Sequence, residues 1–103
     1  MDLPEGRGQL LRMQEARLQK LREIGPVLAG SMAKRKNQAG YYLTDKVEGK
    51  TRTMHVSERA YEDARRWNEN HKEAKRLLDE LSEIQRALIK AEAKEARRSK
   101  RSS

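Results

Sequence analysis

The stretch YYLTDKVEGKTRTMHV, residues 41–56, decides the fold of this 103-residue chain. Two runs rich in aromatic, Thr and Val residues, 41–47 and 50–56, flank Glu48-Gly49, and this pattern predicts a β-hairpin. A two-residue turn would pair Val47 with Lys50 and so determine every other cross-strand pair. Because Glu is not the preferred first residue of such a turn, a three-residue loop with a bulge is an alternative.

The two-residue turn gives the hairpin two unlike faces. One face is apolar with a single ion pair: Tyr41 lies opposite Val56, Leu43 opposite Met54, and Asp45 opposite Arg52. The other face is polar and basic: Tyr42 lies opposite His55, Thr44 opposite Thr53, and Lys46 opposite Thr51. A shift of one residue would mix the two sets, so the alternation favours this register.

A helical pattern precedes the hairpin, from about Glu5 to Ile24, with Leu11, Leu18 and Leu21 on one stripe and Leu10 and Ile24 beside it. Gly25-Pro26 ends it, since Gly suits a helix C-terminus. Residues 27–32 are predicted to form a short helical turn, and residues 33–40 a polar, basic connector.

A second, longer helix is predicted from Ser57, an N-cap candidate, to about Lys94. Its apolar positions advance in steps of four and three, as in a coiled-coil seam. These positions are Ala60, Ala64, Trp67, His71, Ala74, Leu77, Leu81, Ile84, Leu88 and Ala91. The seam is predicted to pack against the first helix.

These elements predict a mainly α fold with a small β-hairpin, in the order α-β-β-α. The short N-terminal helix packs antiparallel on the long C-terminal helix, and the hairpin lies at one end. Residues 1–95 are predicted to form a single domain and residues 96–103 a basic, disordered tail. Part of the long helix is left uncovered, which predicts an interface for a second copy or a larger protein, formed by Leu81, Ile84, Leu88 and Ile89.

Composition excludes several classes of protein. Only 35% of residues are hydrophobic and 4% are aromatic, which is too little for a thick globular core. The chain has no Cys, so it has neither a disulfide framework nor a Cys-based zinc site, and no metal or cofactor is predicted. It opens with no basic, apolar leader and has no apolar run that could span a membrane, so a cytoplasmic protein is expected.

The formal net charge of +8 is concentrated in two segments. Residues 26–56 hold six basic and two acidic side chains, and so do residues 90–103, so each segment contributes +4. The remaining residues are close to neutral. A localised positive excess of this kind is typical of a polyanion-binding surface.

The hairpin and the tail are therefore the candidate nucleic-acid contacts. A two-stranded ribbon fits the major groove of B-form DNA, basic and hydroxyl side chains contact phosphates, and Tyr42 can stack on an unpaired base. The tail would add phosphate affinity without sequence choice. The candidates are Lys34, Arg35, Lys36, Tyr42, Thr44, Lys46, Lys50, Arg52, Thr53, His55, Arg97, Arg98, Lys100 and Arg101. The competing interpretation is a solvated hairpin that only covers the helices, with a solubilising tail.

Catalysis is not predicted. The chain has no Cys nucleophile and no phosphate-binding Gly-rich motif. The acidic pairs Glu62-Asp63 and Asp79-Glu80 are neighbours in sequence, so on a helix their side chains diverge. Nearby Lys and Arg residues make ion-paired surface the better account of them.

Three short motifs carry a family resemblance: Gly30-Ser31-Met32, then Gly40 to Leu43, then Gly49 to Arg52 with Val56 before a long charged helix. Over residues 26–90 the chain resembles a prokaryotic family of small proteins encoded beside transposases in mobile elements. Members carry a cysteine-bearing loop, which is replaced here by Ala33 to Ala39, so a metal site that the resemblance implies is absent from this chain. The resemblance implies a mobile-element context.

Taken together, these features predict a non-enzymatic, nucleic-acid-binding accessory protein, with DNA favoured over RNA. The alternative is a protein-interaction module that dimerises or docks on a larger enzyme through its long helix.

Overall fold

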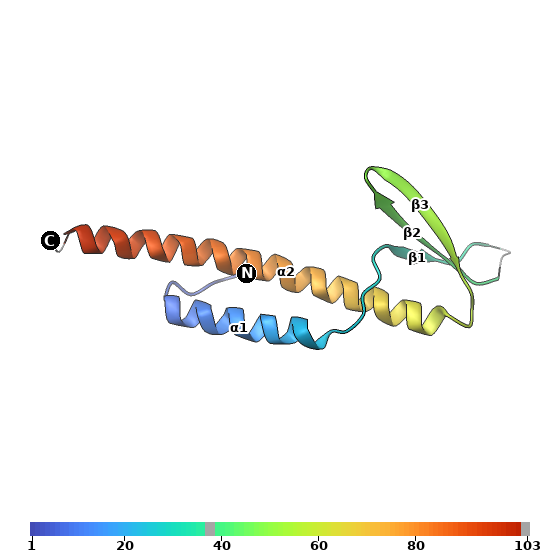
Figure 1. Ribbon diagram of the computed structural model, residues 1–103, viewed down its shortest axis with the longest axis horizontal. Coiled ribbons are helices and arrows are strands. Elements are labelled where there is room, and N and C mark those ends of the chain that lie inside the picture. The colour runs from blue at the N-terminus through green and yellow to red at the C-terminus, as the bar shows by residue number, and fades with distance from the viewer. Residues whose placement is uncertain (37–38, 102–103) are drawn as a thin grey trace. The chain divides into compact units, whose positions relative to one another are not determined.

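The computed structural model describes residues 1–36 and 39–101, with side chains as far as Ser99. The elements are α1 (Arg7–Glu23), β1 (Ser31–Ala33), β2 (Tyr41–Val47), β3 (Lys50–Val56) and α2 (Tyr61–Arg101) (Figure 1). The predicted α-β-β-α order is confirmed, and β1 is an additional strand. No helix in the described part of the chain is long and apolar enough to cross a membrane.

The chain divides into two compact units. The helix-pair unit comprises Met1–Glu23 and Lys75–Ser103, and the sheet unit comprises Ile24–Ala74. The first turns of α2 belong to the sheet unit and its remaining turns to the helix-pair unit. The prediction of a single domain over residues 1–95 concerns how the two units combine, and it stays a prediction.

The hairpin has the predicted register throughout. β2 and β3 are antiparallel, and their pairs run from Val47–Lys50 at the turn to Tyr41–Val56 at the base. Glu48 and Gly49 both have left-handed backbones, with φ of 52° and 78°. Two left-handed central residues define the primed turn whose twist matches that of the strands, so the turn has two residues and the bulged alternative is wrong.

The segment before the hairpin differs from the prediction of a helical turn over residues 27–32. Ser31–Ala33 forms β1, which pairs antiparallel with β2, placing Met32 opposite Leu43. Gly30 has φ of 120°, which no right-handed helix contains, and a Cβ there would lie 2.9 Å from the Thr44 carbonyl oxygen. A strand of three residues is too short to show its period in sequence.

A buried amide holds this segment on α2. Asn68 is only 4% exposed, and its Nδ2 donates to the carbonyl oxygens of Leu28 (2.9 Å) and Gly30 (2.8 Å). The Leu28 N–H donates to the Trp67 carbonyl oxygen at 2.9 Å. These bonds satisfy backbone groups that a helical turn would have paired internally, so the chain enters β1 extended.

The core of the sheet unit lies between the apolar face of the sheet and the first turns of α2. Its buried side chains are those of Leu43, Val56 and Ala64, and the half-buried side chains of Leu28, Met32 and Tyr41 pack against them. The Tyr41 ring stacks on Tyr61 with a centroid separation of 3.8 Å.

In the helix-pair unit, α1 runs antiparallel to α2, as predicted (Figure 1). Arg17 contacts Glu80 at 3.6 Å, whereas Glu5, earlier in the chain, contacts Lys94 at 3.5 Å. Leu18 and Leu21 of the predicted stripe are half-buried, whereas Leu11 is 43% exposed and Leu10, predicted beside the stripe, is fully buried. Neighbouring apolar positions are separated by only 100° on a helix, so the sequence does not choose between them.

The long helix starts and ends later than predicted. Ser57 Oγ accepts the N–H of Ala60 at 3.3 Å, so Ser57 caps the turn that precedes α2 and not the helix itself. The helix continues to Arg101, so the expectation that it ends near Lys94 is wrong. Of the predicted disordered tail, residues 96–103, residues 96–101 are helical, and residues 102–103 lie outside the described residues. No Gly or Pro follows Gly49, and the Ala-rich run 91–96 favours helix.

Candidate nucleic-acid interface

The outward face of the sheet, here called the polar sheet face, carries no carboxylate from its strands. Its side chains come from alternate strand positions: Tyr42, Thr44, Lys46, Thr51, Thr53 and His55. The Thr44 and Thr53 hydroxyls lie 3.2 Å apart. Residues 26–56 contain two acidic residues: Asp45, which is on the opposite face, and Glu48, which is in the turn. The face therefore presents hydroxyls, rings and a cation.

A packed cluster occupies the base of this face. The Arg35 guanidinium lies 4.2 Å from the centroid of the Tyr42 ring, and His55 meets that ring edge-on, with centroids 5.3 Å apart. His55 Nε2 donates to the Ala39 carbonyl oxygen at 3.1 Å. Gly40, with φ of 81°, lets the backbone pass close to the His55 ring. A side chain at this position would clash with that ring, because its Cβ would lie 2.6 Å from His55 Nε2. Arg35 thus occupies one side of the Tyr42 ring.

Two predicted contact residues lie on the opposite face of the hairpin, namely Lys50 and Arg52. Arg52 makes a bidentate ion pair with Asp45, with Nε–Oδ1 and Nη2–Oδ2 distances of 2.6 and 3.0 Å. Arg52 donates both hydrogen bonds, and they lower the pKa of the Asp45 carboxylate that accepts them and raise the pKa of Arg52. The ion pair partly neutralises the charge of Arg52. Arg52 therefore differs from the cations of the polar sheet face in both its position and its free charge.

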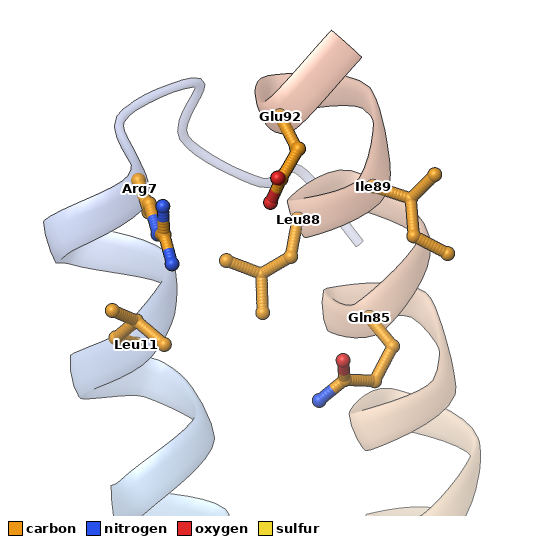
Figure 2. Close-up of a pocket in the computed structure, with 6 residues that line it drawn as sticks. All are labelled: Arg7, Leu11, Gln85, Leu88, Ile89 and Glu92. Carbon is orange, nitrogen blue, oxygen red and sulfur yellow. The ribbon is translucent and has the colours of Figure 1, made fainter. Parts of the chain in front are cut away.

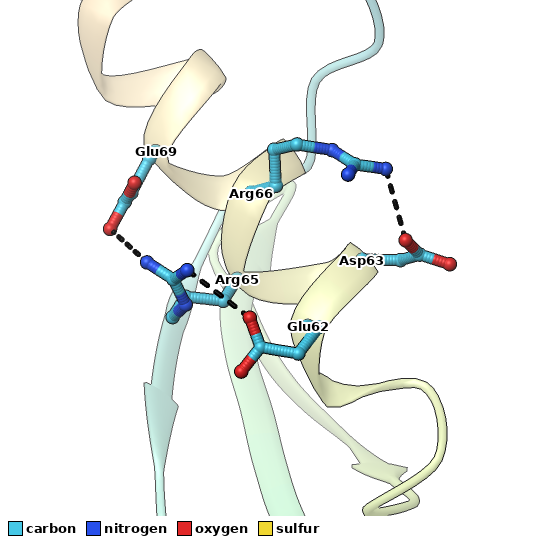
Figure 3. A network of polar contacts seen from close by, with 5 residues as sticks. All are labelled: Glu62, Asp63, Arg65, Arg66 and Glu69. Carbon is cyan, nitrogen blue, oxygen red and sulfur yellow. Dashed lines mark hydrogen bonds and ion pairs between the residues drawn. The ribbon is translucent and has the colours of Figure 1, made fainter.

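Cations of the connector and hairpin differ from those at the start of α2. The side chains of Lys34, Arg35, Lys36, Lys46 and Lys50 are exposed, and none pairs with a carboxylate of the described residues. At the start of α2, Arg65 binds Glu62 at 3.2 Å and Glu69 at 3.0 Å, and Arg66 binds Asp63 at 3.0 Å (Figure 3). The hydrogen bond that Arg65 donates to the Glu62 carboxylate raises the pKa of Arg65. The connector and hairpin therefore carry five exposed cations that no carboxylate of the described residues neutralises.

The predicted basic tail is helical. Arg97 and Arg98 are exposed on α2, and the side chains of Lys100 and Arg101 lie outside the described part of the structure. Lys90, Lys94 and Arg97 follow one another at helical spacing and so share one face. Lys94 contacts Glu5 at 3.5 Å. Lys90, Lys94 and Arg97 therefore form a basic stripe along α2.

The predicted partner interface is only partly exposed. Ile84 is fully buried in the helix-pair unit, so its assignment to an open surface is wrong. Leu81 and Leu88 are half-buried, and Ile89 is 69% exposed. Antiparallel packing of α1 covers the centre of the seam and leaves its margin open.

Sequence reasoning missed the contribution of β1 to the polar sheet face. Ser31 pairs with Thr44 and Ala33 with Tyr42, so both small side chains lie on that face. Their alternation with apolar Met32 is the only signal in the sequence, and three residues are too few to separate it from chance.

No grouping of three or more His, Asp or Glu side chains suited to a metal occurs in residues 1–36 and 39–101. No family model matches the chain, and neither does any curated protein or solved structure. The resemblance to transposase-associated proteins stays a prediction.

Proposed function

We propose that this protein is a non-enzymatic accessory protein that binds nucleic acid, with DNA favoured over RNA, through the polar sheet face. The observation that carries the proposal is the cluster of Arg35, Tyr42 and His55 on the same face as Lys46, where the strands present no carboxylate. Lys and Arg contact phosphates, and Thr hydroxyls hydrogen-bond to them.

The shape of the hairpin supports duplex DNA as the partner. β1 pairs only with residues 42–44 of β2, so the hairpin beyond them, residues 45–52, is two-stranded. A two-stranded ribbon fits the major groove, where base edges are distinguishable. From this ribbon, Lys46 and Thr51 would contact the phosphate backbone of the DNA. Arg35 would lie at the end of the ribbon away from the turn.

Arg35 is the residue proposed to read bases. A guanidinium stacked on a ring keeps its planar fork of donors free at the edge, which suits bidentate contact with guanine or phosphate. Tyr42 would position it. The basic stripe of α2, from Lys90 to Arg97, would add affinity that does not depend on sequence. A mobile-element context and a cytoplasmic location belong to the same proposal.

Charge reversal on the polar sheet face tests the proposal. Lys46→Glu should weaken binding to a labelled DNA duplex and reduce the slope of log K against log salt by roughly one or more, because the variant neutralises fewer phosphates. Lys72→Glu is the matched control, since Lys72 is exposed in the same unit and changes the net charge equally. Equal effects of the two variants, or no binding by the native chain, would contradict the proposal.

Base reading is tested separately, with Arg35→Lys. This variant keeps the charge and removes the fork, so it should reduce the preference between G·C-rich and A·T-rich probes, by about 1–3 kcal/mol for each guanine that Arg35 reads. Tyr42→Leu should do the same by releasing Arg35 from its stack. A preference unchanged in both variants would leave Arg35 as a phosphate contact only.

A second candidate function, a protein-interaction module acting through the long helix, is favoured by the exposure of Leu78 (55%) and Ile89. It is compatible with the first, because many nucleic-acid-binding proteins act as dimers.

A further inference from the structure

A groove runs between α1 and α2 in the helix-pair unit. Its volume is about 350 Å³, and Figure 2 shows the six side chains that line it: Arg7, Leu11, Gln85, Leu88, Ile89 and Glu92. Leu88 points from α2 toward α1, and Leu11 lies opposite it (Figure 2). Its lining combines apolar with polar and charged side chains, as protein interfaces do.

The helix pair is incomplete as a packed unit. Its fully buried large side chains, among the described residues, are Leu10, Leu77 and Ile84. Leu78 and Ile89 each lie one position beyond a seam residue, so α2 has a second apolar margin beside the seam. A helix with one neighbour needs only the narrow seam, whereas a wider apolar face is typical of a helix with two neighbours in a bundle.

The charges at the groove select its occupant. Arg7 comes from α1 and Glu92 from α2, and both side chains lie at the same end of the groove (Figure 2). Glu92 pairs with no cation of the described residues, and the carboxylate paired with Arg7 is that of Glu95, 3.9 Å away and largely exposed. A surface that carries both signs in this way is complementary to itself when rotated by a two-fold axis.

We propose that a second copy of this chain occupies the groove, forming a two-fold dimer whose helix-pair units make a four-helix arrangement. Leu11, Leu88 and Ile89 of each copy pack on those of the other. Arg7 of each copy lies opposite Glu92 of the other, because a two-fold contact repeats every pairing. This inference goes beyond nucleic-acid binding and does not depend on it.

Sedimentation velocity of the full chain, without nucleic acid and over two orders of magnitude in concentration, tests the dimer. The native chain should show a monomer–dimer equilibrium. Ile89→Asp should raise the dissociation constant on the order of 100-fold, because the removed apolar burial counts twice across the axis. Val27→Asp, an exposed apolar residue of the sheet unit, is the matched control and should change nothing. Helical circular dichroism verifies that each variant folds.

A charge exchange tests the pairing itself. Arg7→Glu and Glu92→Arg should each be monomeric, because each places like charges opposite one another twice. An equimolar mixture of the two should restore a dimer, since every contact then joins opposite charges. A native chain that is monomeric at all concentrations would overturn the proposal, and so would Ile89→Asp with native association. A mixture that stays monomeric would also overturn it.

Discussion

The sheet unit and the helix-pair unit use different means of stabilisation. In the sheet unit, backbone hydrogen bonds, a left-handed turn and the buried Asn68 amide hold the chain around a small core. In the helix-pair unit, a few buried aliphatic side chains carry most of the packing. This difference indicates that hydrogen bonds, including those of one buried amide, can organise a sequence with few apolar residues, whereas the two helices depend on apolar contacts.

Polar contacts within the helix pair sharpen this difference. Gln14 and Gln85 hydrogen-bond between the helices, and Glu80 binds both Arg17 and Arg76. Arg17 Nε is buried with no hydrogen-bond partner among the described residues. Polar side chains in a helix interface specify register and lower stability relative to apolar ones. They define how α1 and α2 align, while Leu10, Leu77 and Ile84 supply the stabilisation.

The largest expected effect is the removal of one of these aliphatic side chains. Ile84→Ala should destabilise the helix-pair unit by about 2–5 kcal/mol, because it removes buried methyl groups and leaves a cavity. Urea denaturation followed by circular dichroism measures it. Ile89→Ala, the same change at an exposed site, is the control and should cost less than about 1 kcal/mol in dilute solution. Similar destabilisation by both would show that the helix pair is not the packed unit described.

Next in size is the removal of the amide that holds the sheet unit. Asn68→Ala should cost about 1–3 kcal/mol, because the carbonyl groups of Leu28 and Gly30 lose their donor. Asn70→Ala is the control, since Asn70 donates to Pro26 at 2.9 Å but in an exposed position. Hydrogen exchange of the β1 and β2 amides reports the effect. If Asn68→Ala leaves that exchange unchanged, the amide does not hold β1.

A smaller, stabilising effect is expected in the turn. Glu48→Asn should raise the stability of the sheet unit by up to about 1 kcal/mol, because Asn tolerates the left-handed backbone that Glu48 adopts. Gly49→Ala should have the opposite sign, with a cost of about 1–2 kcal/mol. A Cβ at Gly49 has open space around it, so that cost would be conformational. Thermal unfolding compares the variants, and a destabilising Asn would contradict the turn geometry.

The smallest effect is the acid dependence of the hairpin. The hydrogen bond from Arg52 lowers the pKa of Asp45 in the folded state, so the pair stabilises the fold above the unfolded pKa of about 3.9. That contribution disappears as the pH falls through the lower folded pKa. Arg52→Gln should return the Asp45 pKa toward its ordinary value, measured by carboxyl NMR titration. An unchanged pKa would show that the ion pair does not form in solution.

The hairpin was predictable to the level of individual pairs, because its information is local. The turn at Glu48-Gly49 and the alternation of Tyr41 to Val47 agree on a single register. For the candidate surface, the sequence predicted which residues take part but not how they are arranged. In the structure they lie on two faces, with Lys46 on the polar sheet face and Arg52 on the other. Its grouping of Arg35 with Tyr42 depends on β1, a strand that the sequence does not reveal.

The sequence by itself determined the elements that repeat a pattern over several residues: the two strands of the hairpin, the turn between them and the seam of the long helix. The tertiary structure alone decided three features. It formed β1, buried Leu10 in place of Leu11, and covered Ile84 while leaving Ile89 exposed. The physical reason is that periodicity tells which side of an element is apolar. Only packing against a partner distant in sequence selects, among neighbouring apolar residues, those that become buried.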